Sequence, residues 1–153
     1  MKPGRPGSEG YDRGTAVKFT AREQYGLRAM VELARRYGDG PVSLSKVARV
    51  QGLSQGYLEQ VAAALRRAGL LISRRGAAGG YTLAHEPDAI TVGDVIRVLE
   101  GEIVPMTCVT DEDSCILSCA REGQCATRDV WLTVRRQLEK TLDGTTLADL
   151  VRG

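Results

Sequence analysis

The fold of this 153-residue chain is constrained most by a pair of short helix-forming segments. Each segment is preceded by a serine, and a glycine lies between the two. A serine directly before a helix accepts a hydrogen bond from the first helical turn, so Ser43 and Ser54 predict two helix starts. The tight turn at Gly52 lies between the two segments. The apolar residues at helical spacing are Leu44, Val47 and Ala48 in the first segment, and Tyr57, Leu58, Val61, Leu65 and Ala68 in the second. Two capped helices joined by a glycine-containing turn are typical of a helix-turn-helix.

A longer helix is predicted to precede this pair. Thr20 and Glu23 have the capping-box spacing, in which each side chain satisfies a backbone donor of the other residue. Gly38, Gly40 and Pro41 predict where the helix ends. Its apolar face at helical spacing comprises Tyr25, Ala29, Met30, Leu33, Ala34 and Tyr37.

A glycine-rich hairpin follows the helix-turn-helix. Residues 70–73 and 81–83 have the composition of strands, and residues 74–80 between them contain three glycines. Because this loop leads into a second strand and not into a helix, it does not fit a dinucleotide-binding loop. Arg74 and Arg75 at its base are typical of the wing of a DNA-binding domain.

The C-terminal half is predicted to be helical, with one interruption. Thr91 to Asp94 predicts another capped helix start, and Gly101 its end. A long helix is expected from Ala126 to Leu142, and a short one from Leu147 to Val151. The long helix carries a stripe of Val130, Trp131, Val134 and Leu138. This stripe is too apolar for a solvated helix, so we expect it to pack against the same chain's core or, as we favour, against a second copy.

The fold class is therefore mainly α with a small β-hairpin wing: a winged helix-turn-helix with a long C-terminal dimerisation helix. We divide the chain into a disordered tail (1–16), a winged helix-turn-helix DNA-binding domain (17–100), a cysteine-rich loop (101–125), and the dimerisation helix with its C-terminal segment (126–153).

The start of the second helix of the pair is the expected reading element. The major groove, about 12 Å wide, admits one helix, whose first residues face the bases. Hydroxyl, amide and carboxylate groups there suit base edges, and Tyr57 either bonds a phosphate or fills the core. The candidate DNA-binding residues on this helix are Ser54, Gln55, Tyr57, Glu59 and Gln60, and those on the wing are Arg74, Arg75 and Gly76. Taken alone, these residues would better fit a solvated helix face. The capped helix pair followed by an arginine wing reverses that preference, so double-stranded operator DNA is the expected partner.

All four cysteines lie between positions 108 and 125. Clustered cysteines in a cytosolic protein favour metal or redox chemistry over structural disulfides. The cysteines are Cys108, Cys115, Cys119 and Cys125, and no Cys-x2-Cys pair occurs among them, which weakens the case for structural zinc. Thiolates suit an iron–sulfur cluster, while zinc or a thiol–disulfide switch are the alternatives.

Net charge, the lengths of apolar runs and the histidine content restrict the functions that this chain can have. The formal net charge is +2, so DNA binding depends on local charge. No apolar run approaches the about 20 residues of a membrane helix, and we expect a cytoplasmic protein with no membrane partner. His85 is the one histidine, in a position expected to be a surface loop, so a thiol enzyme with a histidine base is disfavoured and no catalytic residue is expected.

The motifs together resemble those of the IscR–NsrR–CymR family of regulators. The resemblance covers residues 17–151, through 18–30, 53–60, 65–70, 75–81 and 125–131. It implies a homodimeric winged-helix regulator in which Ser54, Tyr57, Glu59, Gln60, Arg75 and Gly76 contact DNA.

The resemblance also implies a 2Fe–2S or 4Fe–4S cluster. Its implied ligands are Cys108, Cys119 and Cys125, with Cys115 as an ambiguous fourth thiol. In some relatives a histidine stands at the position of Arg128, which cannot ligate, and in others a carboxylate near the start of the first helix comes from the partner subunit. The matching position here is Gln24, with Glu23 beside it. We therefore expect a repressor that senses redox state, nitric oxide or iron–sulfur status. The alternative is the same DNA-binding regulator without a cluster, switched by thiol–disulfide chemistry, zinc or a partner protein.

Overall fold

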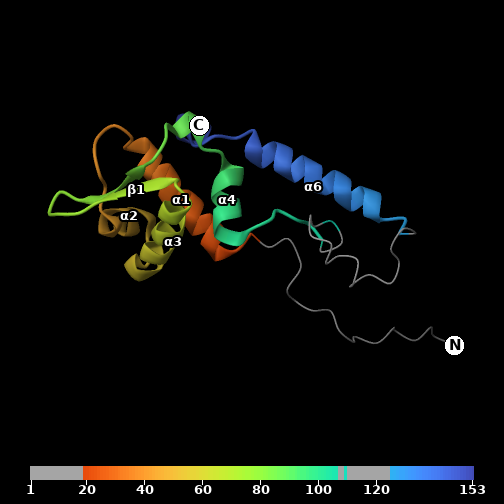
Figure 1. The fold of residues 1–153 in the computed structure, drawn as a ribbon, viewed down its shortest axis with the longest axis horizontal. Coiled ribbons are helices and arrows are strands. Elements are labelled where there is room, and N and C mark those ends of the chain that lie inside the picture. Colours follow the sequence, from red (N-terminus) through yellow and green to blue (C-terminus); the bar gives the residue numbers. More distant parts are fainter. Residues whose placement is uncertain (1–18, 107–108, 110–124) are drawn as a thin grey trace.

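A computed structural model describes residues 19–106, 109 and 125–153 of the chain. Figure 1 shows a body of short helices with a two-stranded hairpin at one end and a long helix that leaves it at the other. The elements are α1 (Ala21–Arg35), α2 (Leu44–Gln51), α3 (Gln55–Arg67), β1 (Leu71–Arg74), β2 (Gly80–Leu83), η1 (Pro87–Ala89), α4 (Val92–Glu100), α6 (Arg128–Asp143) and α7 (Leu147–Arg152).

The four capped helix starts that the sequence predicts are confirmed. Thr20 and Thr91 each form a complete capping box, and Ser43 and Ser54 each accept a hydrogen bond from the backbone two residues into the helix that follows. Thr146 forms a further capping box at the start of α7. Caps are local interactions, which is why local sequence predicts them well.

Several predicted boundaries are wrong by one or two residues. α1 ends at Arg35, so Tyr37 lies in the following turn and is 43% exposed instead of facing the core. Ala68 is the exposed cap of α3. β1 and β2 pair from Leu71 opposite Leu83 to Arg74 opposite Gly80, and α6 spans 128–143 instead of 126–142.

The core lies between α1, α3, the hairpin and the C-terminal helix. Its fully buried side chains include Met30, Leu58 and Leu65, and also Leu147 from α7. Because α7 packs against α1, the end of the chain is part of the same packed body as the helix-turn-helix.

The return of the chain into this body is fixed by backbone pairing. Thr91 and Thr146 form an isolated antiparallel bridge just before α4 and α7. The amide of Val92 donates to the carbonyl of Thr145 (2.8 Å), and the amide of Leu147 donates to the carbonyl of Ile90 (2.9 Å).

Of the described α-helices, α6 alone has no buried residue. Leu138 and Leu142, in its C-terminal half, pack against Val92 and Ile96 of α4. Figure 1 shows the N-terminal half extending away from the body. No described helix is long and apolar enough to cross a membrane.

We expect Leu147→Ala to lower the free energy of unfolding by about 2–5 kcal/mol, because it leaves a cavity in the core shared with α1. Leu150→Ala is the matched control, since Leu150 lies on the same helix and is only partly buried. Urea denaturation of both variants measures the difference. A loss at Leu147 no larger than that at Leu150 would contradict the assignment of α7 to the core.

Candidate functional site

The turn between α2 and α3 is built by one glycine and held by α1. Gly52 adopts the left-handed conformation (φ 65°, ψ 37°) that ends α2, and Leu53 donates to the carbonyl of Ala48 (2.8 Å). The Arg28 guanidinium of α1 donates to both the side chain and the backbone carbonyl of Gln51, at 3.0 and 3.1 Å. α1 therefore holds the C-terminal end of α2, directly before the turn.

The first two turns of α3 present polar side chains to solvent. Ser54, Gln55, Glu59 and Gln60 are all exposed. The Gln55 amide donates to the Glu59 carboxylate at 3.3 Å, which restrains both side chains on one face. Ser54 accepts from the amide of Tyr57, so its hydroxyl serves as the helix cap.

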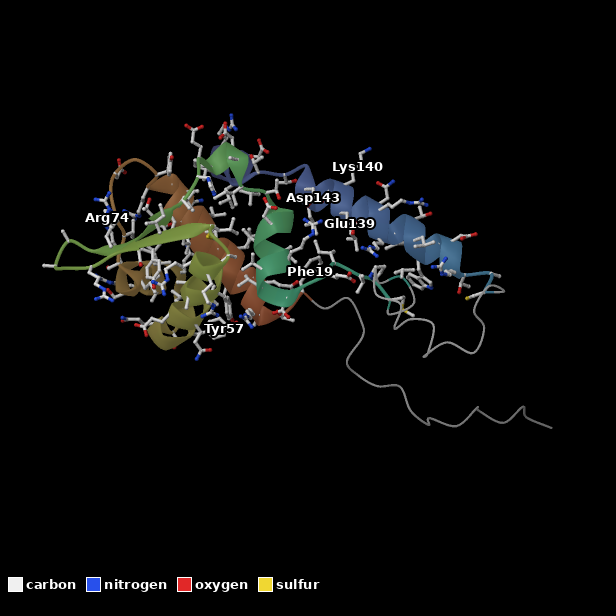
Figure 2. The ribbon with its side chains drawn as sticks, viewed as in Figure 1. Phe19, Tyr57, Arg74, Glu139, Lys140 and Asp143 are labelled. Atoms are coloured by element: carbon white, nitrogen blue, oxygen red, sulfur yellow. The ribbon has the colours of Figure 1, made fainter. Side chains whose placement is uncertain are left out.

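Tyr57 fills the boundary between the core and this exposed face. Its ring lies edge-to-face against Tyr25 of α1, with centroids 5.9 Å apart and planes at 89°. Of the two roles considered for Tyr57, the ring serves packing. Tyr57 is half-buried, and Figure 2 labels it beside α3.

The hairpin is attached to the segment that leads into α2. Val42 and Tyr81 exchange two backbone hydrogen bonds, at 2.8 and 2.9 Å. Gly80 is required at this contact, because a Cβ there would lie 2.3 Å from the carbonyl oxygen of Val42. The hairpin and the helix-turn-helix are thus one rigid unit at this junction.

The predicted wing residues are all exposed. Arg74 ends β1, and Arg75 and Gly76 begin the loop, where Gly76 has a φ of 111°. In Figure 2, Arg74 lies at the hairpin and Tyr57 on the lower side of the body, both away from α6. Exposed polar groups on α3 and cations on the wing therefore lie in the part of the molecule away from α6, an arrangement that can read base edges and bind phosphates together.

The predicted cluster ligands lie largely outside the described residues. Cys108, Cys115 and Cys119 fall in that part of the sequence, and Cys125 alone is described. Cys125 is partly exposed, and its thiol forms a 3.3 Å hydrogen bond with the Thr127 hydroxyl just before α6. Within the described residues, no three His, Cys, Asp or Glu side chains are grouped to hold a metal ion.

The other end of the cysteine segment also contacts α6. Val109, which follows Cys108 in the sequence, is buried, and its carbonyl accepts a hydrogen bond from Arg135 of α6. Arg135 is held in turn by Glu139 at 3.0 Å. Residues at both ends of the segment 108–125 are therefore tied to α6 or its start.

The two residues considered as a fourth ligand differ in their surroundings. Glu23 is buried, and its carboxylate accepts from the Thr20 amide in the capping box. Gln24 is exposed. His85 is exposed as well, as expected. In Figure 1 the start of α6 lies well away from the start of α1 in the same chain.

One ion pair joins α4 to the C-terminal end of α6. The Arg97 guanidinium donates to both carboxylate oxygens of Asp143, at 2.6 and 2.8 Å. These hydrogen bonds lower the pKa of the Asp143 carboxyl and raise the pKa of Arg97.

Sequence reasoning missed this pair, together with Arg28 and Arg135. Arg97 and Asp143 are 46 residues apart, and pairing at that distance leaves no periodic signal in a single sequence.

A family model described as "Iron-dependent Transcriptional regulator", Rrf2, matches residues 19–153. The HTH-type transcriptional regulator CymR of Bacillus subtilis is 46% identical over 134 residues, which cover 88% of this chain and 89% of that protein.

Two solved structures share the fold. The B. subtilis CymR structure, described as the global cysteine regulator, has a TM-score of 0.75 and 46% identity, covering 89% of this chain and 97% of that one. The T. potens IscR structure has a TM-score of 0.71 and 45% identity, covering 89% and 87%. The mainly helical winged-helix fold expected from the sequence is confirmed.

Proposed function

Because this chain belongs to the Rrf2 family of transcriptional regulators, we propose that it is a homodimer that binds operator DNA through α3 and the hairpin, under the control of the segment 108–125. The observation that carries this proposal is the exposed polar first two turns of α3, together with the exposed arginines of a hairpin that is paired with the segment leading into α2. We further propose a cytoplasmic location, which agrees with operator DNA as the partner.

The glycines of the described helices add support for DNA contact at α3. Three described helices contain a glycine: Gly26 in α1, Gly56 in α3 and Gly93 in α4. A Cβ at Gly26 would lie 2.3 Å from the Leu99 side chain, and one at Gly93 would lie 1.9 Å from Asp143, so neighbouring side chains explain both.

Gly56 has no such explanation within the described part of the chain. A Cβ there would meet nothing within 4 Å, and its φ is not positive. Glycine in the middle of a helix costs about 0.5–1 kcal/mol relative to alanine, and Gly56, the second residue of α3, bears a part of that cost. We infer that a partner molecule approaches the helix backbone at Gly56, as expected for the wall of a DNA groove.

We expect Gly56→Ala to raise the free energy of unfolding by up to about 0.5 kcal/mol and to weaken operator binding about 10-fold. The probe is a duplex that the wild type selects from a randomised library, and fluorescence anisotropy measures its affinity. The two effects have opposite signs, so a general loss of structure cannot produce both. Unchanged affinity would remove Gly56 from the interface.

The homodimer is supported by the uncovered part of α6. Val130 is 54% exposed, and Trp131 and Val134 lie beyond the part of the helix that packs on α4. A second copy of the same helix would cover these side chains, and two-fold symmetry matches paired operator half-sites.

We expect Val134→Glu to weaken dimerisation by more than about 100-fold, because a carboxylate would be buried without a partner. Thr133→Glu adds the same charge at an exposed neighbouring position and serves as the control. Sedimentation equilibrium gives both dissociation constants. Equal values for the two variants would exclude this part of α6 from the interface.

The chemistry of the cysteine segment supports an iron–sulfur cluster as its sensor. Cys108, Cys119 and Cys125 would hold the cluster, and the partly exposed thiol of Cys125, just before α6, fits a soft ligand of iron. The cluster, when bound, supplies one-electron redox chemistry. The chain's own contribution is the attachment of this segment to α6 through Arg135 and Val109, so that a change in the segment reaches the dimer helix.

We expect anaerobically purified wild-type protein to contain iron and sulfide and to absorb in the visible range. Cys125→Ser should lose both signals and should bind the selected duplex with the same affinity before and after treatment with iron and sulfide. The wild type should change its affinity about 5-fold or more on that treatment. Cys115→Ser is the comparison, since Cys115 is the ambiguous ligand.

A thiol switch is the second candidate, favoured by the similarity to CymR, which is described as a cysteine regulator. In that case the purified protein would be colourless, and diamide, a thiol oxidant, would change the affinity of the wild type for the duplex. A colourless protein that responds to diamide and not to iron and sulfide would overturn the cluster and leave the DNA-binding proposal intact.

A further inference from the structure

The junction between α4 and α6 combines three interactions of different directionality. Leu138 and Leu142 pack against an apolar face of α4. The free energy of such apolar burial depends on the buried area and has no preferred direction. The bridge at Thr91 and Thr146 fixes where the chain returns to the body. Only the pair of Arg97 and Asp143 is both directional and part of the α6 helix itself.

The geometry of the Arg97–Asp143 ion pair restricts the angle between α4 and α6. A guanidinium bound to both oxygens of a carboxylate forms two parallel hydrogen bonds, which restrict rotation as well as distance. The pair joins the middle of α4 to the last residue of α6.

Gly93 shows how closely the carboxylate approaches α4. A Cβ at this position would lie 1.9 Å from Asp143 Oδ1 and 2.9 Å from Arg97 Nη1. Asp143 therefore lies directly on the α4 backbone, one turn before Arg97, and any side chain at position 93 would displace it. In Figure 2, Asp143 lies at the end of α6 nearest α4, with Glu139 and Lys140 on the preceding turn.

The length of α6 magnifies any change at this junction. Its 16 residues extend about 24 Å, so a rotation of about 10° at Asp143 moves the far end by about 4 Å. That displacement is close to the rise of one DNA base pair, about 3.4 Å. In a dimer held through the N-terminal half of α6, the same rotation changes the separation of the two α3 helices.

We propose that Gly93, Arg97 and Asp143 are positioning residues for operator binding: they set the direction of α6 relative to α3 and thereby the half-site spacing that the dimer accepts. This inference rests on the proposed homodimer and adds to it a determinant of specificity that does not touch DNA.

The test measures operator affinity as a function of the spacing between the two half-sites, which we call the spacing profile. The wild type selects operators from a randomised duplex library, and the selected site is rebuilt with its half-sites moved apart or together by one and two base pairs. Anisotropy gives the affinity of each duplex and of a single half-site for the wild type and for Arg97→Gln, Asp143→Asn and Gly93→Ala. Lys140→Gln is the matched control, because it removes a charge from an exposed position on α6 about one turn before Asp143.

We expect the wild type and Lys140→Gln to prefer one spacing, and the three junction variants to lose about 5-fold or more of that preference or to shift its optimum. Single half-site affinity should stay unchanged, because α3 and the hairpin are intact. Arg97→Lys, which keeps the charge but not the two parallel hydrogen bonds, should fall between Arg97→Gln and the wild type.

Profiles of all three junction variants that match the control would overturn the inference while leaving the homodimer in place. An equal loss of affinity at every spacing would also overturn it, since that result indicates a role in stability alone. If the wild type itself selected lone half-sites, the homodimer proposal would fail first, and this inference with it.

Discussion

The backbone pairing of residues 90–92 with residues 145–147 is the constraint on which the rest of this structure depends. The chain leaves the body after α4 and comes back through α6. Two backbone hydrogen bonds and the buried side chain of Leu147 make that return part of the core. Without them α6 would be a tail joined at one end. With them it is a helix whose C-terminal end is fixed to the unit that carries α3.

Local sequence predicted the parts of the molecule that local interactions build. The caps at Thr20, Ser43, Ser54 and Thr91 satisfy backbone donors within three residues, so the residue types alone indicate them. Boundaries were less accurate where no cap is present. α6 has no side-chain cap at Thr127, and it begins at Arg128, two residues after the start that the sequence predicts.

Contacts between distant segments could not be predicted in the same way. The pairing of Arg97 with Asp143, the hydrogen bonds of Arg28 to Gln51 and the burial of Leu147 each depend on the tertiary fold. Gly26, Gly56 and Gly93 are indistinguishable in the sequence, yet two are enclosed by neighbours and one is open. The candidate reading residues were predictable because they follow a cap, while the residues that orient them were not.

The side chains that we propose to contact DNA carry little of the protein's own stability. Gln55, Glu59, Gln60, Arg74 and Arg75 are exposed, and their contacts with one another are weak. The core beneath them is apolar and separate. Substitutions at these positions can therefore accumulate without unfolding the chain. Under the proposed function, a regulator of this fold can acquire a new operator by changing a few surface residues on an unchanged core.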